Sequence, residues 1–260
     1  MLTSIDGNLM DSANATISVL DEGLLRGDGV FEVIRVYEGR PFALDEHLDR
    51  MARSAASLRL ALDVDAIRSD VDALLAEGER SDAALRLVVT RGGRRIALLE
   101  PLKTFPDTIA LATITYAPTR VLDGVKSLSY GANMLATRLA KEAGAEEALL
   151  VSPHGRVLEG PTTSFFYVLD GELCTPPLSD RILDSISRRV LLAVTDARER
   201  VTTVDDLASI SEAFLASSLR EVMAVSSIDG RAIEAAPGPV AIEAAERVRE
   251  HIEAALRPRA

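Results

Sequence analysis

The sequence is short of several residue types, and each shortage excludes a class of protein. Its single cysteine, Cys174, cannot form an internal disulfide, so we expect a reducing, cytoplasmic location. Its three histidines, His47, His154 and His251, show no metal-site spacing, so no metal centre is expected. A net charge of −11 disfavours nucleic-acid binding. No apolar run approaches the roughly 20 residues of a membrane span, and no signal segment is expected at the N-terminus.

Lysine is also scarce, because 26 of the 29 basic residues are arginines. Arginine stays protonated at neutral pH, whereas a deprotonated lysine can form a Schiff base with an aldehyde. If the protein uses such chemistry, only Lys103, Lys126 and Lys141 are candidates. The sequence also lacks a Gly-x-Gly-x-x-Gly motif and a Gly-x-Ser-x-Gly motif, which leaves the common nucleotide-binding and serine-hydrolase interpretations without support.

Strands and helices are mixed in two blocks, which predicts a mixed α/β (α+β) fold with two domains. Residues 30–44 alternate and break at Glu38-Gly39, as in a hairpin, and Asp45 is expected to cap a helix over 45–58. The periodicity predicts further helices at 64–77, 129–143, 184–197 and 238–256, and strands at 82–90, 107–116, 147–151, 163–168, 171–175, 212–217 and 222–227.

A polar, proline-containing sequence, APTRVLDGV, begins at residue 117. Such a composition is typical of a linker between domains. We therefore expect an N-terminal domain over 1–117, a linker over 118–125 and a C-terminal domain over 126–260.

Two groups of hydroxyl residues have positions that suit an anion. Ser185, Ile186 and Ser187 stand at the start of an expected helix, where backbone N–H groups favour negative charge, although a simple serine cap explains them as well. Ser217 and Ser218 follow an expected strand, which is a common ligand position and also a common plain loop.

Three charged residues are candidates for chemistry. Arg50, at i+3 from His47, either binds a phosphate with its planar fork or is solvated. Glu159 precedes a glycine and is either an exposed turn residue or a buried carboxylate that needs a cationic partner, such as a protonated pyridine nitrogen. Lys126 has apolar neighbours, so it is either a desolvated, reactive amine or an ordinary surface lysine.

The order of these residues resembles the class IV aminotransferases, which are fold-type IV pyridoxal-phosphate enzymes. Four blocks carry the resemblance nearly from end to end: RGDGVFEVIRVYEGRPFALDEHLDR (26–50), GVKSLSYGANMLATRLAKEAGAEEALLV (124–151), GRVLEGPTTSFFYVLDGELCTPPL (155–178) and LASSLREVMAV (215–225). The resemblance implies a small N-terminal α/β domain, a larger barrel-like C-terminal domain, pyridoxal 5'-phosphate as cofactor and a homodimer.

The resemblance also implies roles for single residues. Lys126 forms the Schiff base and moves protons, and Glu159 holds the pyridine nitrogen. Further cofactor contacts are implied for Arg50, Tyr130, Ile186, Ser187, Ser218 and Leu219, and substrate contacts for Phe31 and Val33. This chain departs from the family in having Ser185-Ile186-Ser187 where Gly-Ile-Thr is frequent, and Ser218 where threonine is usual.

The sequence GDGVFEVIRVY is most similar to the D-amino acid transaminases, which exchange the amino group between a D-amino acid and a 2-oxo acid. That group commonly has tyrosine at the place of Phe31. It holds the substrate carboxylate from the neighbouring subunit, with an arginine and a histidine after Thr-Arg-Gly. Here Thr90-Arg91-Gly92 is followed by Arg94 and Arg95 without a histidine, so Arg94, Arg95 and Arg220 are the candidates, unless they are solvated.

Other functions stay open. A branched-chain L-amino acid aminotransferase would share phenylalanine at Phe31 and a tyrosine after the lysine. An aminodeoxychorismate lyase usually reads Lys-His-Leu-Asn-Arg, against KSLSY at 126–130 here. An (R)-selective amine transaminase would need a loose carboxylate site. A pyridoxal-phosphate-binding protein without turnover is the alternative from another class, and the presence of Lys126, Glu159 and Arg50 argues against it.

Overall fold

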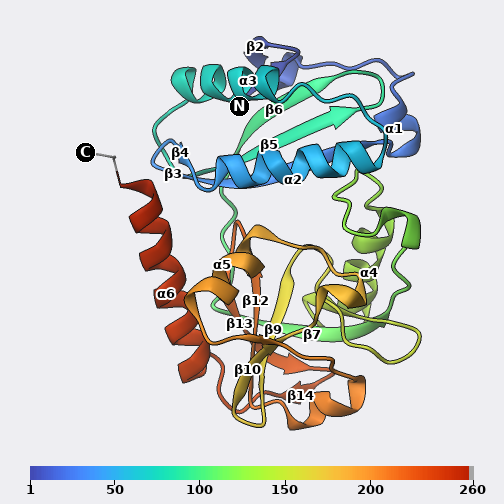
Figure 1. Cartoon of the computed structure of the whole chain (residues 1–260), viewed down its shortest axis with the longest axis vertical. Coiled ribbons are helices and arrows are strands. Elements are labelled where there is room, and N and C mark those ends of the chain that lie inside the picture. Colours follow the sequence, from blue (N-terminus) through green and yellow to red (C-terminus); the bar gives the residue numbers. More distant parts are fainter. Residues whose placement is uncertain (258–260) are drawn as a thin grey trace. The chain divides into compact units, whose positions relative to one another are not determined.

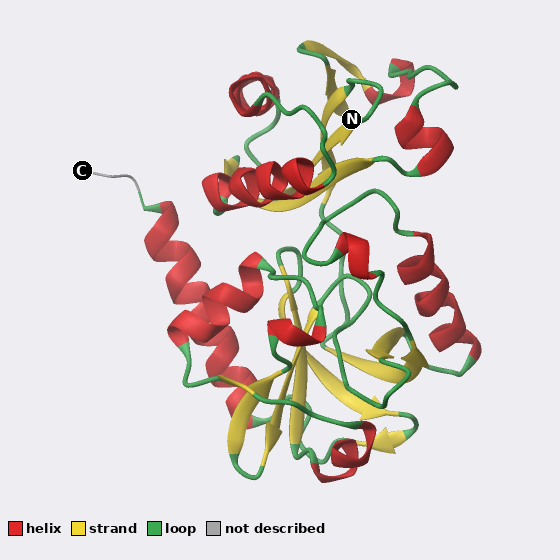
Figure 2. Ribbon diagram, turned by 45° about the vertical axis from the view of Figure 1, so that its right-hand side comes forward, coloured by secondary structure: helices red, strands yellow, loops and turns green. Residues whose placement is uncertain are grey.

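The computed structural model describes residues 1–257 and divides them into two compact units. The first unit contains Met1–Lys103 and Val125–Tyr130, and the second contains Thr104–Gly124 and Gly131–Arg257. Each unit combines helices with its own sheet (Figure 1, Figure 2). The mixed α/β fold expected from the sequence is therefore confirmed.

The first unit is built on a six-stranded antiparallel sheet with the order β2-β1-β6-β5-β3-β4. Along its long strands, successive side chains point to opposite faces of the sheet, and the apolar side chains of one face form the core. The strands are β1 (Leu2–Ile5), β2 (Asn8–Asp11), β3 (Gly29–Tyr37), β4 (Arg40–Pro41), β5 (Ala83–Thr90) and β6 (Arg95–Pro101).

Helix α2 (Leu44–Ser57) packs on β3, α3 (Val64–Glu77) packs on β6 and β1, and the short α1 (Glu22–Arg26) lies at β5. The core between sheet and helices is formed by aliphatic side chains such as Val30, Ile34 and Leu85 from the strands and Met51 and Leu74 from the helices. This core fixes α2 beside β3, so the side chains of these two elements come together.

The second unit is built on an eight-stranded mixed sheet with the order β11-β10-β9-β12-β13-β7-β8, and β14 pairs with β13. Strands β7 and β8 run parallel, as do β13 and β7, whereas β9, β12 and β13 are antiparallel neighbours. The strands are β7 (Thr108–Thr115), β8 (Glu147–Val151), β9 (Ser164–Leu169), β10 (Glu172–Thr175), β11 (Arg198–Glu199), β12 (Glu212–Ser217), β13 (Glu221–Ile228) and β14 (Arg231–Ala232).

Isolated backbone pairings connect the two ends of this sheet. Val151, the last residue of β8, pairs with Val157, and Arg156 pairs with Thr203, which follows β11 along the chain. The N–H of Val157 also donates to the carbonyl of Thr202. The segment around Val157 thus bridges the strands at the two ends of the sheet order, which accounts for the barrel-like form of the unit.

Three helices cover the second unit. Helix α4 (Gly131–Glu142) packs on β7 and β8, while α5 (Ile186–Val194) and α6 (Pro239–Leu256) pack on each other and on β12. The carboxylate of Glu212 accepts hydrogen bonds from the backbone N–H groups of Val240 and Ala241 and so caps the start of α6. Within residues 1–257, no helix combines the length and apolar character that a bilayer span requires.

The compact units divide the chain at other points than the domains expected at 1–117 and 126–260. Strand β7 belongs to the second unit because it pairs with β8 and β13, although it precedes the expected linker. Residues Val125–Tyr130 belong to the first unit because they pair with the start of β3. The expected linker over 118–125 contains a short 3-10 helix, Arg120–Leu122.

Most expected elements are present, and α3 and β8 have the expected bounds. The expected cap of α2 is wrong: the cap residue is Ala43, in the left-handed region, and Asp45 lies in the first turn instead. The sequence reasoning also missed α1, β1, β2 and β6. The strands β1 and β2 have only four residues each. Strand β6, RIALLEP, is longer but does not alternate apolar and polar residues regularly.

Candidate active site

Helix α2 carries a polar stripe on its buried face. His47, Arg50 and Ser54 are separated by three and four residues, so they share one side of the helix. Their exposed fractions are 1%, 5% and 0%, although the neighbouring Leu48 and Met51 belong to the apolar core. Buried polar groups cost free energy unless they are paired, and this stripe finds its partners in β3 and in the Lys126 segment.

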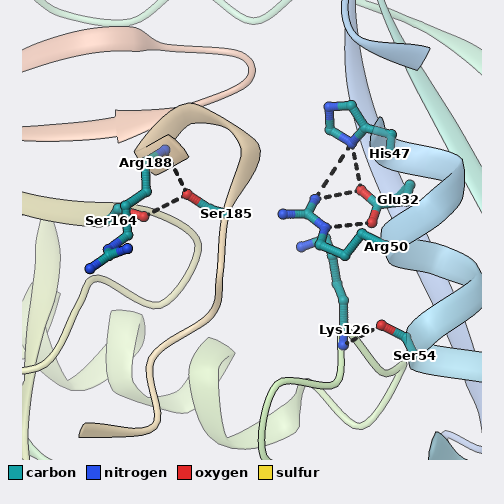
Figure 3. Close-up of polar contacts among 8 residues, drawn as sticks. All are labelled: Glu32, His47, Arg50, Ser54, Lys126, Ser164, Ser185 and Arg188. Carbon is teal, nitrogen blue, oxygen red and sulfur yellow. Dashed lines mark hydrogen bonds and ion pairs between the residues drawn. The ribbon is translucent and has the colours of Figure 1, made fainter. Parts of the chain in front are cut away.

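The first partner is Glu32, which interrupts the apolar stripe of β3. Its carboxylate receives two hydrogen bonds from the guanidinium of Arg50, from Nε to Oε1 at 2.7 Å and from Nη2 to Oε2 at 2.6 Å (right part of Figure 3). Burial raises the pKa of Glu32, but hydrogen bonds and charges from Arg50 and His47 outweigh it and hold the pKa at about 2. Glu32 is therefore an anion at neutral pH.

His47 completes this buried cluster. Its Nδ1 lies 2.7 Å from Oε2 of Glu32. Burial lowers the pKa of His47, and this outweighs the opposing contribution of the Glu32 carboxylate, with the charges of Arg50 and Lys126 lowering it further. The ring is therefore neutral at pH 7, and Nδ1–H donates to the carboxylate. Among residues 1–257, Nε2 of His47 has no hydrogen-bond partner.

Lys126 is attached to the first unit through its backbone. Its N–H donates to Oγ of Ser54 at 3.1 Å, at the end of the α2 stripe (Figure 3). Its carbonyl accepts from the N–H of Phe31 at 3.3 Å, and the N–H of Leu128 donates to the carbonyl of Gly29 at 2.9 Å. Residues 126–128 thus extend alongside the start of β3, and this pairing determines where the lysine side chain begins.

The side chain of Lys126 lies over two aromatic rings. Its Nζ is 4.3 Å from the ring centroid of Phe31 and 5.7 Å from that of Tyr130. The two rings meet edge to face, with centroids 5.2 Å apart and an interplanar angle of 87°. Three residues singled out in the sequence therefore lie together, and Val33 is half-buried two positions further along β3.

Glu159 belongs to the second unit and is half-buried. Its Oε1 accepts a hydrogen bond from the N–H of Leu183 at 3.0 Å, which brings the carboxylate to the segment that leads into α5. Its charge also acts on Tyr116, whose pKa is raised by burial and then by Glu159. The carboxylate is therefore held next to the start of α5.

Ser185 is the N-cap of α5, and its Oγ accepts from the N–H of Arg188 at 3.0 Å (left part of Figure 3). The same oxygen lies 2.7 Å from Oγ of Ser164 on β9, so the cap is tied to the sheet. Ile186 and Ser187 are the first two residues of the helix. Their N–H groups belong to its positive end, which attracts anions.

Ser218 and Leu219 lie in the turn between β12 and β13, half-buried. The N–H of Arg220 donates to Oγ of Ser217 at 3.3 Å. The guanidinium of Arg220 lies 2.5 Å from the carboxylate of Glu147 on β8 and 5.1 Å from the ring centroid of Phe105. Arg220 therefore connects this turn to the neighbouring strand through a largely buried ion pair.

Arg94 and Arg95 are paired with carboxylates of the first unit. Arg94 lies 2.5 Å from Asp6, and its side chain is 44% exposed. Arg95 lies 2.9 Å from Asp70, whose side chain is only 6% exposed. Each arginine that was a candidate for the substrate carboxylate thus has a carboxylate of the chain itself as partner.

Two carboxylates that take part in these arrangements were missed in the sequence. Glu32 stands between two residues that were assigned to a substrate pocket, and Glu147 begins a strand. For Glu32 a signal was available, because a charge within an apolar strand face indicates a buried carboxylate that needs a cationic partner. For Glu147 none was, because its partner Arg220 is distant in sequence.

Each unit, taken by itself, carries groups of the kind that pyridoxal 5'-phosphate requires. The first unit supplies an amine on Lys126, which can join to an aldehyde, and a guanidinium on Arg50, which is suited to a phosphate. The second unit supplies the Glu159 carboxylate, which suits a protonated ring nitrogen, and the helix start at Ser185 with its hydroxyl groups, which suits a phosphate.

Comparison with known proteins points in the same direction. The sequence profile of a family described as amino-transferase class IV matches residues 29–228. A Methanocaldococcus jannaschii protein, provisionally named a branched-chain-amino-acid aminotransferase, is 36% identical over 257 residues, 88% of each chain. A D-alanine aminotransferase of Bacillus licheniformis is 32% identical, covering 92% of this chain and 93% of that protein. The pyridoxal-phosphate-bound structure of an aminotransferase from Mycobacterium tuberculosis matches with a TM-score of 0.89 at 26% identity, covering 98% of this chain and 99% of that chain.

Proposed function

The chain belongs to the class IV aminotransferases, and on that premise we propose that it transfers the amino group between a D-amino acid and a 2-oxo acid. As a member of that family it is a pyridoxal-phosphate-dependent aminotransferase that acts on amino acids and keto acids. The transfer itself is supported by the placement of Lys126, whose backbone is tied to β3 and α2 and whose amine lies over Phe31. Amino-group transfer needs such an anchored amine. The choice of a D-amino acid is supported by the similarity to D-alanine aminotransferases.

Bound pyridoxal phosphate supplies an aldehyde that joins to amines and a ring that accepts the electrons released when the substrate α-carbon loses its proton. Lys126 has two tasks. Its Nζ would hold the cofactor while no substrate is bound, and as a free amine it would take the proton from the substrate α-carbon. The backbone hydrogen bonds of residues 126–128 fix where this side chain begins, so the amine works from one anchor point in both tasks.

The other residues orient the reaction. We assign to Glu159 the retention of a proton on the ring nitrogen, and to Arg50, Ser187 and Ser218 contacts with the phosphate. Ile186, Leu219 and Tyr130 add further contacts to the cofactor. Transfer in two halves, with the first product leaving before the second substrate binds, gives ping-pong kinetics.

For the substrate carboxylate we propose Arg94. Its ion pair with Asp6 is exposed, and exposed pairs contribute only about 0–1 kcal/mol, so a substrate can replace Asp6 at little cost. Arg95 and Arg220 are held by carboxylates that are much more buried, Asp70 and Glu147. Displacing those partners would leave a buried carboxylate unpaired, which is costly.

A half-reaction screen tests the proposal. The cofactor absorbance of the loaded protein is followed after addition of D-alanine, L-leucine or a primary amine without a carboxylate. We expect bleaching with D-alanine and none with L-leucine, and no bleaching at all in Lys126→Ala. Arg94→Ala should need roughly tenfold more D-alanine, with no change for the simple amine, because one charge-assisted contact is lost.

A branched-chain L-aminotransferase is the second candidate. It is favoured by the 36% identity to the Methanocaldococcus jannaschii protein and by phenylalanine at Phe31. Bleaching with L-leucine but not with D-alanine would establish this alternative and end the first proposal. Absorbance that responds to no amine would instead indicate a cofactor-binding protein without turnover.

A further inference from the structure

We propose that Phe31 is a positioning residue for Lys126. Together with Tyr130 it forms an aromatic cradle, defined here as the two rings that face Nζ of Lys126 in the first unit. The cradle holds the side-chain ammonium whenever Lys126 is not joined to the cofactor. Its use in turnover rests on the proposed function, whereas its effect on the charge of Lys126 does not.

The geometry is that of a cation over an aromatic face. Nζ lies 4.3 Å from the centroid of Phe31, inside the roughly 6 Å within which a ring face attracts an ammonium. Tyr130 adds a second, more distant ring at 5.7 Å. The edge-to-face contact between the rings fixes both against each other.

The cradle is preorganised because its parts share a backbone frame. Phe31 donates its N–H to the carbonyl of Lys126, and Val30 pairs with Ser127. A shift of the Lys126 backbone relative to the Phe31 backbone would break these hydrogen bonds. Phe31 is also buried, with 9% of its surface exposed, so the ring acts on the ammonium from a site of low dielectric constant.

The charges around Lys126 in the first unit set the context. Arg50 is a cation, His47 is neutral, Glu32 is an anion held by both of them, and Tyr130 is a further titratable neighbour. The charge of Lys126 lowers the pKa of His47, so the amine and this cluster interact. The two ring faces lie against Nζ itself, so their attraction for the ammonium adds to whatever this cluster contributes.

The cradle gives Phe31 a role toward the lysine in addition to any contact with substrate. An amine that leaves the cofactor on a flexible four-carbon chain can adopt many positions, and the ring face limits them. The aliphatic side chain of leucine would preserve the burial but not the quadrupole of the ring. The comparison of Phe31→Leu with Phe31→Tyr therefore isolates the ring.

The first test measures lysine charge directly. The full chain, with isotope-labelled lysine and loaded with pyridoxamine 5'-phosphate so that Lys126 carries a free amine, is titrated by NMR. Lys103 and Lys141 are the only other lysines and serve as internal references. In Phe31→Leu the midpoint of the Lys126 titration should fall by about half to one pH unit, because the ammonium loses the ring, while Phe31→Tyr keeps the midpoint.

Tyr130→Leu is the second variant, and it should shift the midpoint in the same direction by less, because its ring is further away. The proposal is wrong if the midpoint of the Lys126 titration is unchanged in Phe31→Leu, or if it falls equally in Phe31→Tyr. Neither result depends on which amino acid is the substrate.

The second test concerns turnover with the substrate that the wild type accepts. Phe31→Leu should lower kcat roughly fivefold and change KM by much less, and deuterium at the substrate α-carbon should slow this variant more than it slows the wild type. Phe31→Tyr should recover the rate. A rise in KM with constant kcat would show that Phe31 only lines the substrate site. A wild type that turns over no amine would contradict the proposed function, and the NMR titration would still decide about the cradle.

Discussion

The most informative single residue is Glu32, a charge within the core of the first unit. Its side chain is completely buried, among aliphatic residues of β3 and α2. The desolvation of a buried carboxylate is offset only if its partners are well placed, and Arg50 and His47 supply three hydrogen bonds to it. These hydrogen bonds hold the guanidinium of Arg50 against β3.

We predict that Glu32→Gln lowers the free energy of unfolding by about 3 kcal/mol, the usual result of breaking one side of a buried ion pair. Arg50 then loses its counter-charge while it stays buried. Urea denaturation at pH 7 measures the change. The control is Glu100→Gln, which breaks a half-exposed pair with Arg86 at 2.8 Å and should cost less than about 1 kcal/mol. Equal losses in the two variants would contradict this account.

The same cluster gives a pH dependence with a defined sign. Folding lowers the pKa of Glu32 from 4.5 to about 2, so its contribution to stability is complete above pH 4.5 and is lost between there and pH 2. Folding also lowers the pKa of His47 from its usual 6.5, so stability begins to fall as the pH drops below 6.5. In Glu32→Gln the fall below pH 4.5 should be smaller by about 3 kcal/mol.

At the scale of the element, the start of α5 shows how this chain departs from its family. The family resemblance implies a frequent glycine at the place of Ser185, whose hydroxyl here caps the helix and contacts Ser164. Its backbone is extended, with φ of −78°, so the position does not need glycine. The serine side chain therefore adds a hydrogen bond that glycine could not make, because its Oγ accepts from the N–H of Arg188.

We predict that Ser185→Ala destabilises the protein by about 1 kcal/mol and that Ser185→Gly costs only a few tenths, as at other N-caps. Alanine cannot accept the hydrogen bond of Arg188, whereas glycine lets water reach that N–H. Thermal unfolding of the two variants measures the difference. If alanine were no worse than glycine, the cap hydrogen bond would not contribute to stability.

At the scale of the whole molecule, the first unit exposes an apolar segment around α1. Val19, Leu20, Leu24 and Leu25 are between 57% and 77% exposed. Clustered apolar surface of this kind marks interaction sites in proteins that assemble. It supports the homodimer that the family resemblance implies, and a symmetric dimer is also the commonest closed assembly.

We predict a solution mass of twice 27.9 kDa by light scattering. Leu24→Lys should shift the protein toward the monomer, because it buries a charge in the contact. The control is Val201→Lys, at a comparably exposed apolar residue of the second unit, which should leave the mass unchanged. A wild type that stays monomeric at high concentration would rule out the homodimer.

The sequence by itself determined the family, the fold class and most elements. Four blocks in a fixed order identify the aminotransferase family, because their motifs are long and ordered. Helices and strands with strong periodicity, such as α3, β8 and β12, follow from local patterns alone. The scarcity of lysine also limits Schiff-base chemistry to three residues.

Only the tertiary structure decided which charges meet. The pairing of Glu32 with Arg50, the attachment of residues 126–128 to β3, and the ion pairs of Arg94 and Arg220 all join residues far apart in the chain. Periodicity describes one element at a time and carries no information on which elements become neighbours. The sequence identified Lys126 as a candidate. The aromatic ring next to its amine could not be identified in this way, because Phe31 reaches Lys126 only through the pairing of residues 126–128 with β3.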